Sequence, residues 1–138
     1  MINAMLAERL VIENQLPELR RMAQWLQDSA AASGVAEDDI FRLDVCANEA
    51  VANIISYAFN DPLRHDIILE MHKTTAGVRL DIRDDGKPFN LLEAAEHQAP
   101  VELGEAKIGG LGIHLIRRLM PGCQYRHVDG FNVLSLDV

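Results

Sequence analysis

Two polar residues, Glu49 and Asn53, lie four positions apart in a segment whose apolar residues follow a helical spacing. Residues four apart share one face of a helix. At 100° per residue, Glu49 and Asn53 fall within about 60° of Arg42 and Ser56, so the four residues form one polar stripe. A carboxylate beside an amide can orient a water or a hydroxyl group, or hold Mg²⁺ through oxygen ligands. Taken alone, the pattern is more typical of a helix face that is simply solvated.

A second candidate is Asp84, which follows Leu80 and Ile82 by steps of two and is therefore expected on the core face of a strand. A buried carboxylate needs a hydrogen-bond donor. A protein amine, a backbone N–H or the exocyclic amine of a ligand base can supply it. Gly86 permits close approach to the backbone. The alternative is an aspartate that caps its own turn, as often occurs before glycine.

The third candidate is the run Gly109-Gly110-Leu111-Gly112, which is expected to open a helix. Glycines at a helix N-terminus expose N–H groups and let a phosphate approach the positive end of the dipole. Lys107 stands just before the run and could meet a terminal phosphate. The run is neither a P-loop nor a full dinucleotide-binding fingerprint. A flexible turn remains the alternative.

Composition excludes several other function classes. The chain has 138 residues and a net charge of −8, which disfavours a sequence-independent grip on nucleic acid. Its five histidines have no metal-ligand spacing to each other or to cysteine, and no serine lies in a hydrolase elbow. Two cysteines are too few for a disulfide scaffold. We find no signal peptide and no membrane span, so we expect a cytoplasmic protein with no membrane partner.

The elements that must position these residues follow from periodicity and turn signals. We expect one domain, 1–138, of the α+β class: a two-layer sandwich with a mixed, mostly antiparallel sheet and about three helices on one face. Asp129-Gly130 predicts a tight hairpin. The expected strands are 10–12, 67–73, 78–83, 123–128 and 131–138. The expected helices are 17–32, 37–59 and one starting at 109, and 90–108 is expected to be a functional loop.

The three candidates occur in one order: Glu49-x-x-x-Asn53, then Asp84-x-Gly86-x-Pro88-Phe89, then the glycine run. In order and spacing they resemble the asparagine box and the two glycine boxes of the GHKL ATPases, which include gyrase, histidine kinases and MutL. The Pro88-Phe89 ending and the tight glycine run look most like the anti-sigma-factor serine kinases of the RsbW and SpoIIAB type. The resemblance covers roughly 8–138 and implies the Bergerat ATP-binding fold.

The resemblance also implies a role for each matching position. Asn53 looks like the Mg²⁺-binding asparagine and Glu49 like the general base that takes the proton of the substrate hydroxyl. Asp84 looks like the carboxylate that recognises the adenine amine, and 90–108 resembles the ATP lid. The lid has one lysine, so the partner of the γ-phosphate stays unassigned. The implied nucleotide-binding set is Asn53, Asp84, Gly86, Pro88, Lys107, Gly109, Gly110, Leu111 and Gly112.

For function, the resemblance implies an ATP- and Mg²⁺-dependent serine/threonine protein kinase that acts as an anti-sigma factor. Its implied partners are a sigma factor, a STAS-domain antagonist that it phosphorylates, and a second copy of itself, with no direct contact to nucleic acid. One alternative is a non-catalytic ATP-binding module that sequesters a protein partner, although the presence of Glu49 speaks against it. A histidine-kinase catalytic domain is disfavoured because too few residues precede Glu49 to form a phosphoacceptor helix pair.

Overall fold

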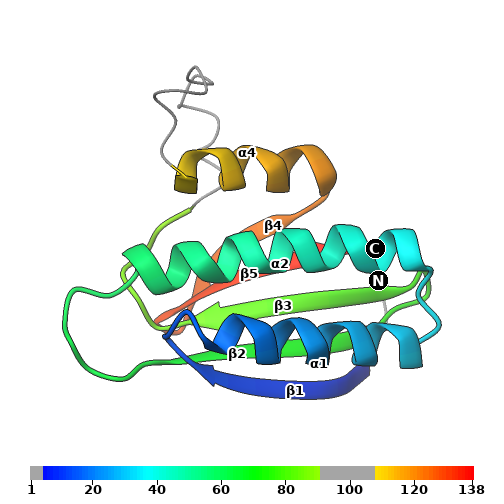
Figure 1. Cartoon of the computed structure of the whole chain (residues 1–138), viewed down its shortest axis with the longest axis horizontal. Coiled ribbons are helices and arrows are strands. Elements are labelled where there is room, and N and C mark those ends of the chain that lie inside the picture. Colours follow the sequence, from blue (N-terminus) through cyan, green and yellow to red (C-terminus); the bar gives the residue numbers. More distant parts are fainter. Residues whose placement is uncertain (1–4, 91–107) are drawn as a thin grey trace.

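A computed structural model describes residues 5–90 and 108–138 of the chain (Figure 1). Within these residues the chain forms five strands and three helices. In chain order they are β1 (Met5–Glu13), α1 (Glu18–Ala32), α2 (Glu37–Tyr57), β2 (Asp66–Lys73), β3 (Val78–Asp84), α4 (Ile108–Leu119), β4 (Gln124–Val128) and β5 (Phe131–Asp137). None of the described helices combines the length and the apolar character needed to cross a membrane.

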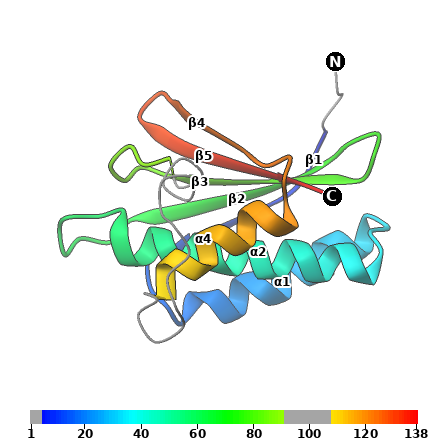
Figure 2. The ribbon, with the colours of Figure 1, turned by 90° about the horizontal axis from the view of Figure 1, so that it is seen from above.

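The strands form one sheet in the order β1-β2-β3-β5-β4, and the three helices cover one of its faces (Figure 2). The α+β two-layer architecture expected from the sequence is therefore confirmed. All four described strand pairings are antiparallel. Strand β4 runs parallel to β3, but β5 is inserted between them, so the crossover through α4 creates no parallel neighbours.

Helix α2 is the centre of the helical layer and packs against both α1 and α4. Its first turn carries Glu37, Asp38 and Asp39, whose charges interact favourably with the N-terminal end of the helix dipole. Its buried residues follow a spacing of three and four, which turns one apolar stripe toward the sheet. These residues are Leu43, Cys46, Ala47, Ala50, Val51, Asn53 and Ile54.

Strand β3 lies in the middle of the sheet and shows why Asp84 points inward. Leu80, Ile82 and Asp84 are all buried, as the alternation predicts. In the register with β5, Asp84 lies opposite Asn132 and Asp81 lies opposite Ser135. Since positions 81 and 84 are an odd number of residues apart, these two pairs face opposite sides of the sheet.

The element boundaries agree with the sequence except at the ends. Strand β1 starts at Met5 rather than at position 10. The prediction began too late because β1 is an edge strand whose first residues are exposed and show no alternation. Helix α2 ends at Tyr57, two residues before the predicted end. The hairpin at Asp129-Gly130 is confirmed, and both residues have positive φ angles (53° and 84°), as a two-residue type I′ turn requires.

Candidate functional site

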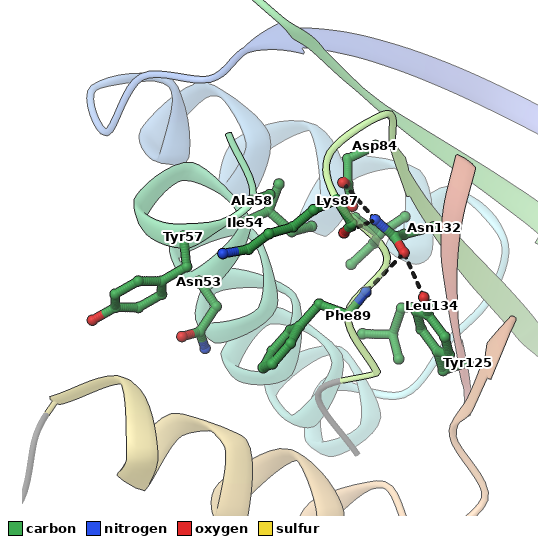
Figure 3. Close-up of a pocket in the computed structure, with 11 residues that line it drawn as sticks. Asn53, Ile54, Tyr57, Ala58, Asp84, Lys87, Phe89, Tyr125, Asn132 and Leu134 are labelled. Atoms are coloured by element: carbon green, nitrogen blue, oxygen red, sulfur yellow. Dashed lines mark hydrogen bonds between the residues drawn. The ribbon is translucent and has the colours of Figure 1, made fainter. Parts of the chain in front are cut away.

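A pocket lies where the C-terminal end of α2 faces the ends of β3 and β5 and the turn that follows β3 (Figure 3). Its walls are mostly apolar, and a few polar groups converge on them. This composition is typical of a site for a small organic ligand or cofactor. The lining residues are Asn53, Ile54, Tyr57, Ala58, Ile82, Asp84, Lys87, Phe89, Tyr125, Asn132 and Leu134.

Asp84 supplies the buried carboxylate of this pocket and is 3% exposed. Its Oδ1 accepts hydrogen bonds from the backbone N–H of Gly86 at 2.9 Å and from Asn132 Nδ2 at 3.0 Å. No residue in 5–90 or 108–138 donates to Oδ2, so one carboxylate oxygen remains for a ligand. Burial raises the pKa of Asp84, and the hydrogen bonds from Asn132 and Gly86 oppose that increase. Both readings of the sequence apply, because Asp84 caps its own turn and also faces the pocket.

Asn132 is a polar residue of the pocket to which the sequence analysis assigned no role. It is 6% exposed, and its Nδ2 donates to three acceptors. These are Asp84 Oδ1 at 3.0 Å, the Lys87 carbonyl at 3.0 Å and the Gly86 carbonyl at 3.3 Å. The amide therefore joins strand β5 to the end of β3 and to the turn after it.

The amide oxygen of Asn132 is also engaged. It accepts a hydrogen bond from the hydroxyl of Tyr125 and another from the backbone N–H of Phe89 at 3.3 Å (Figure 3). Burial raises the pKa of Tyr125, which keeps its proton on the hydroxyl at neutral pH. Asn132 thus connects β4 as well as β3 to the wall of the pocket.

Asn53 lies on the pocket side of α2 and is 8% exposed, which excludes the solvated-face alternative for this residue. Its Nδ2 donates to the backbone carbonyl of Glu49 at 3.0 Å. No described residue donates to its Oδ1, so the amide presents an oxygen ligand to the pocket. Glu49 is half-buried one helical turn earlier and does not line the pocket.

Gly86 is where the turn after β3 meets the end of α2. A Cβ added at this position would lie 2.6 Å from both the Cβ and the carbonyl oxygen of Ala58, and 2.9 Å from Asp84 Oδ1. The backbone N–H of Lys87 also donates to the Ala58 carbonyl at 3.0 Å. The residue that approaches Gly86 closely is thus Ala58 of the protein itself, and only glycine fits there.

Lys87 is a further pocket residue to which the sequence analysis assigned no role, because the positive charge was expected in the lid. Its side chain extends along the pocket toward Asn53 and Tyr57 (Figure 3). Of the residues that line the described pocket, it is the one with a positive charge. A lysine directly after the Asp84-x-Gly86 motif was the available signal.

The remaining predicted residues are not brought into this pocket by the described part of the chain. Pro88 is exposed and does not line it. Lys107 and most of the expected lid lie outside the described residues. Gly109, Gly110, Leu111 and Gly112 are the second to fifth residues of α4, so the flexible-turn alternative is not supported. Among the described residues, no cluster of histidine, cysteine and acidic side chains is suited to hold a metal.

The chain matches the model of the histidine kinase-like ATPase domain over residues 12–138. It is 33% identical over 112 residues to the serine/threonine-protein kinase BtrW of Bordetella bronchiseptica, covering 81% of this chain and 79% of the relative. It is also 28% identical to the serine-protein kinase RsbW of Listeria innocua, covering 79% of this chain and 72% of that protein.

Two solved structures share the fold at 16% sequence identity. One contains the RsbU and RsbW domains of a Mycobacterium tuberculosis protein, with a TM-score of 0.64; the match covers 94% of this chain and 32% of that longer chain. The other is the histidine kinase domain of a blue-light activated histidine kinase from Erythrobacter litoralis, with a TM-score of 0.57, covering 89% of this chain and 59% of that one. At this identity the two matches support the fold alone.

Proposed function

Because this chain belongs to the family of histidine kinase-like ATPase domains, we propose that it is an ATP-dependent serine/threonine protein kinase that acts as an anti-sigma factor. In this proposal it works in the cytoplasm as a homodimer, binds a sigma factor, and transfers phosphate to a serine or threonine of a STAS-domain antagonist. The names of the relatives BtrW and RsbW, both protein kinases, support the reaction class.

The observation that carries the proposal is the Asp84 carboxylate, with one oxygen held by the protein and the other left for a ligand inside an apolar pocket. Adenine is flat and apolar on both faces and carries an exocyclic amine at its edge. The apolar walls suit its faces, and Asp84 Oδ2 suits its amine as a charged acceptor. A carboxylate cannot donate to the carbonyl oxygen that guanine carries at the equivalent position, so the site favours adenine.

Asn53 fits the role of a magnesium ligand, because its amide nitrogen is tied to the helix and its oxygen remains available. Mg²⁺ prefers oxygen ligands and is usually held by few protein groups together with substrate phosphates. When bound, the ion offsets negative charge on the phosphates. The positive charge of Lys87, which extends toward Asn53, acts in the same direction.

Phosphoryl transfer depends mainly on positioning and charge neutralisation, so the protein has few covalent tasks. Glu49 is our candidate for the general base that orients the acceptor hydroxyl and accepts its proton. It lies one turn from Asn53 on the same helix, is half-buried, and is outside the pocket wall. The first turn of α4, whose N–H groups have no partner within the helix, is our candidate contact for the phosphates.

The test is transfer of ³²P from γ-labelled ATP to a purified STAS-domain protein, with wild type, Glu49→Gln and Glu37→Gln. Glu37 is an exposed acid in the first turn of the same helix and serves as the matched control. We expect Glu49→Gln to bind ATP normally and to lose transfer by roughly 10²- to 10⁴-fold, the usual contribution of a general base. Glu37→Gln is expected to behave as wild type.

Each other outcome has a defined meaning. Normal transfer by Glu49→Gln contradicts its role as the base. ATP binding by wild type without transfer to any STAS protein supports the non-catalytic binding module instead. Labelling of a histidine side chain supports the histidine-kinase alternative. Absence of nucleotide binding by wild type overturns the proposal as a whole.

A further inference from the structure

The side-chain amide of Asn132 has no capacity left for a ligand. An asparagine side chain has two N–H donors and one carbonyl oxygen with two lone pairs. The two N–H groups of Nδ2 are already shared among three acceptors, the Asp84 carboxylate and the backbone carbonyls of Gly86 and Lys87. Oδ1 already accepts from two donors. Asn132 lines the pocket, but its polar atoms are used within the protein.

The orientation of this amide is determined by its partners. A backbone N–H can only donate, so the atom that faces Phe89 N must be the amide oxygen. The Gly86 and Lys87 carbonyls can only accept, so the atom that faces them must be the amide nitrogen. A flipped amide would lose all three contacts, and the Asn132–Asp84 hydrogen bond with them.

We propose that Asn132 is the positioning residue of this pocket: its amide fixes the Asp84 carboxylate and the turn from Gly86 to Phe89 in the arrangement that receives the adenine base, without contacting the base itself. This inference rests on the proposed function of the same site. It follows from one residue bridging β3, β4 and the turn through five hydrogen bonds at 6% exposure.

The most informative variant is Asn132→Asp, which keeps the shape of the side chain and replaces the donor by a carboxylate. Near neutral pH the carboxylate oxygen that replaces Nδ2 lies against the Asp84 carboxylate and two carbonyl oxygens, where like charges repel and the donor of the amide is lost. We expect the Kd for ATP, measured by calorimetry, to rise at least ~10-fold near pH 8.

The pH dependence separates positioning from general loss of structure. When two carboxyl groups share a site, one of them binds a proton at a higher pH than usual. The protonated group can then donate to its neighbour, as the amide does in wild type. We therefore expect the Asn132→Asp defect to shrink as the pH falls toward about 5.5. The other charged groups that act on Asp84 are Asp85 and His127, and the wild-type protein at each pH corrects for their titration.

Ser135→Ala is the matched control. Ser135 is also a buried polar residue of β5, and its hydroxyl bonds to Asp81, its register partner on β3, but on the opposite face of the sheet. Removal of this hydrogen bond is expected to lower Tm and to leave the Kd for ATP unchanged at every pH. Tyr125→Phe removes one of the five bonds to Asn132 and is expected to raise the Kd about 2- to 5-fold.

Asp84→Asn distinguishes failure of this inference from failure of the proposed function. If Asp84→Asn weakens ATP binding while Asn132→Asp binds like wild type near pH 8, the positioning role is overturned and the pocket stands. A pH-independent defect in Asn132→Asp also overturns it. If Asn132→Asp does not fold, Tyr125→Phe decides, since an unchanged Kd in that variant contradicts the inference. If Asp84→Asn binds ATP normally, the adenine pocket itself is wrong and this inference falls with it.

Discussion

Asp84 and Asn132 face each other across β3 and β5, and a 3.0 Å hydrogen bond joins the Asn132 amide to Asp84 Oδ1. The pair places an acidic group inside the apolar layer between sheet and helices, where burial raises the pKa of Asp84. Such a carboxylate costs stability whenever it is ionised. The presence of a buried acid that lowers stability supports a role for Asp84 in ligand binding.

The first prediction concerns the opposite effects of Asp84→Asn on stability and on binding. Asparagine can still accept the hydrogen bonds from Gly86 and Asn132 through its amide oxygen, and it removes the buried charge. We expect Tm of the ligand-free protein to rise by a few degrees. We expect the Kd for ATP to rise roughly 10- to 150-fold, because a hydrogen bond to a charged acceptor contributes about 1.5–3 kcal/mol.

The stability gain of Asp84→Asn should depend on pH in a defined direction. The unfolded carboxyl group titrates near 3.8, and its folded pKa is raised. Above pH 3.8 the carboxyl group is ionised in the unfolded chain but still protonated in the folded protein. The free-energy cost that Asp84 imposes on folding therefore grows with pH until the pH passes the raised pKa. Denaturant unfolding at a series of pH values should show no gain in acid and a constant gain near neutral pH. A variant less stable than wild type at neutral pH would contradict this account.

A second prediction concerns Gly86→Ala. The added Cβ would lie 2.6 Å from the Cβ and carbonyl oxygen of Ala58, so the turn and the end of α2 must move apart. We expect the free energy of unfolding to fall by about 1–3 kcal/mol and ATP binding to weaken, because Asp84 Oδ1 is also displaced. Gly122→Ala is the control, since a Cβ there meets nothing within 4 Å. Equal stability of the two variants by denaturant unfolding would disprove the close-packing argument.

A third prediction concerns His65, in the connection between α2 and β2. Its Nε2 lies 2.7 Å from Asp61 Oδ1 and its Nδ1 lies 3.3 Å from Asp85 Oδ1, and the ring stacks on Phe59. The hydrogen bond with Asp61 raises the pKa of His65 above 6.5, partly opposed by burial, with a smaller contribution from Asp85. The ion pairs therefore stabilise the fold fully below pH 6.5, and this stabilisation is lost as the pH rises through the raised pKa.

We expect wild type to melt at a higher temperature than His65→Gln below pH 6.5, and the difference to shrink at alkaline pH. Asp61→Asn should reduce the same pH dependence, because it removes the main partner. Melting curves across this range provide the measurement. A difference between wild type and His65→Gln that grows with pH would have the wrong sign.

The sequence predicted the parts of the site that depend on local periodicity. The alternation along β3 placed Asp84 on the core face, because the central strand buries every second residue. The spacing of Glu49 and Asn53 predicted a shared helical stripe. The spacing did not show that Asn53 lines the pocket while Glu49, one turn away, does not. A stripe spans several turns of a helix, whereas this pocket contacts only the last turns of α2.

Asn132 could not be found in this way, because its role comes from contacts with residues 43 to 48 positions earlier in the chain. The spacing of apolar residues along the chain does not indicate which strand lies beside β5 or how the turn after β3 is oriented. The start of β1 was missed for another reason. An edge strand with exposed apolar residues such as Met5 and Leu6 lacks the burial pattern on which strand prediction relies.

The last prediction concerns Lys87, whose side chain extends along the pocket toward Asn53 (Figure 3). In the proposed function this end of the pocket holds the phosphates, so the ammonium group should attract a triphosphate and be indifferent to a nucleoside. We expect Lys87→Met to raise the Kd for ATP by about 1.5- to 5-fold, as for loss of one exposed charge pair, and to leave the Kd for adenosine unchanged. The ATP effect should weaken with added salt, because exposed charges are screened. Lys73→Met, at the far end of β2, removes another exposed lysine that lies outside the pocket, and should change neither Kd. Equal losses for ATP and adenosine in Lys87→Met would instead assign the lysine stem to the wall that packs on the base, and would leave the phosphates to groups contributed by other parts of the chain.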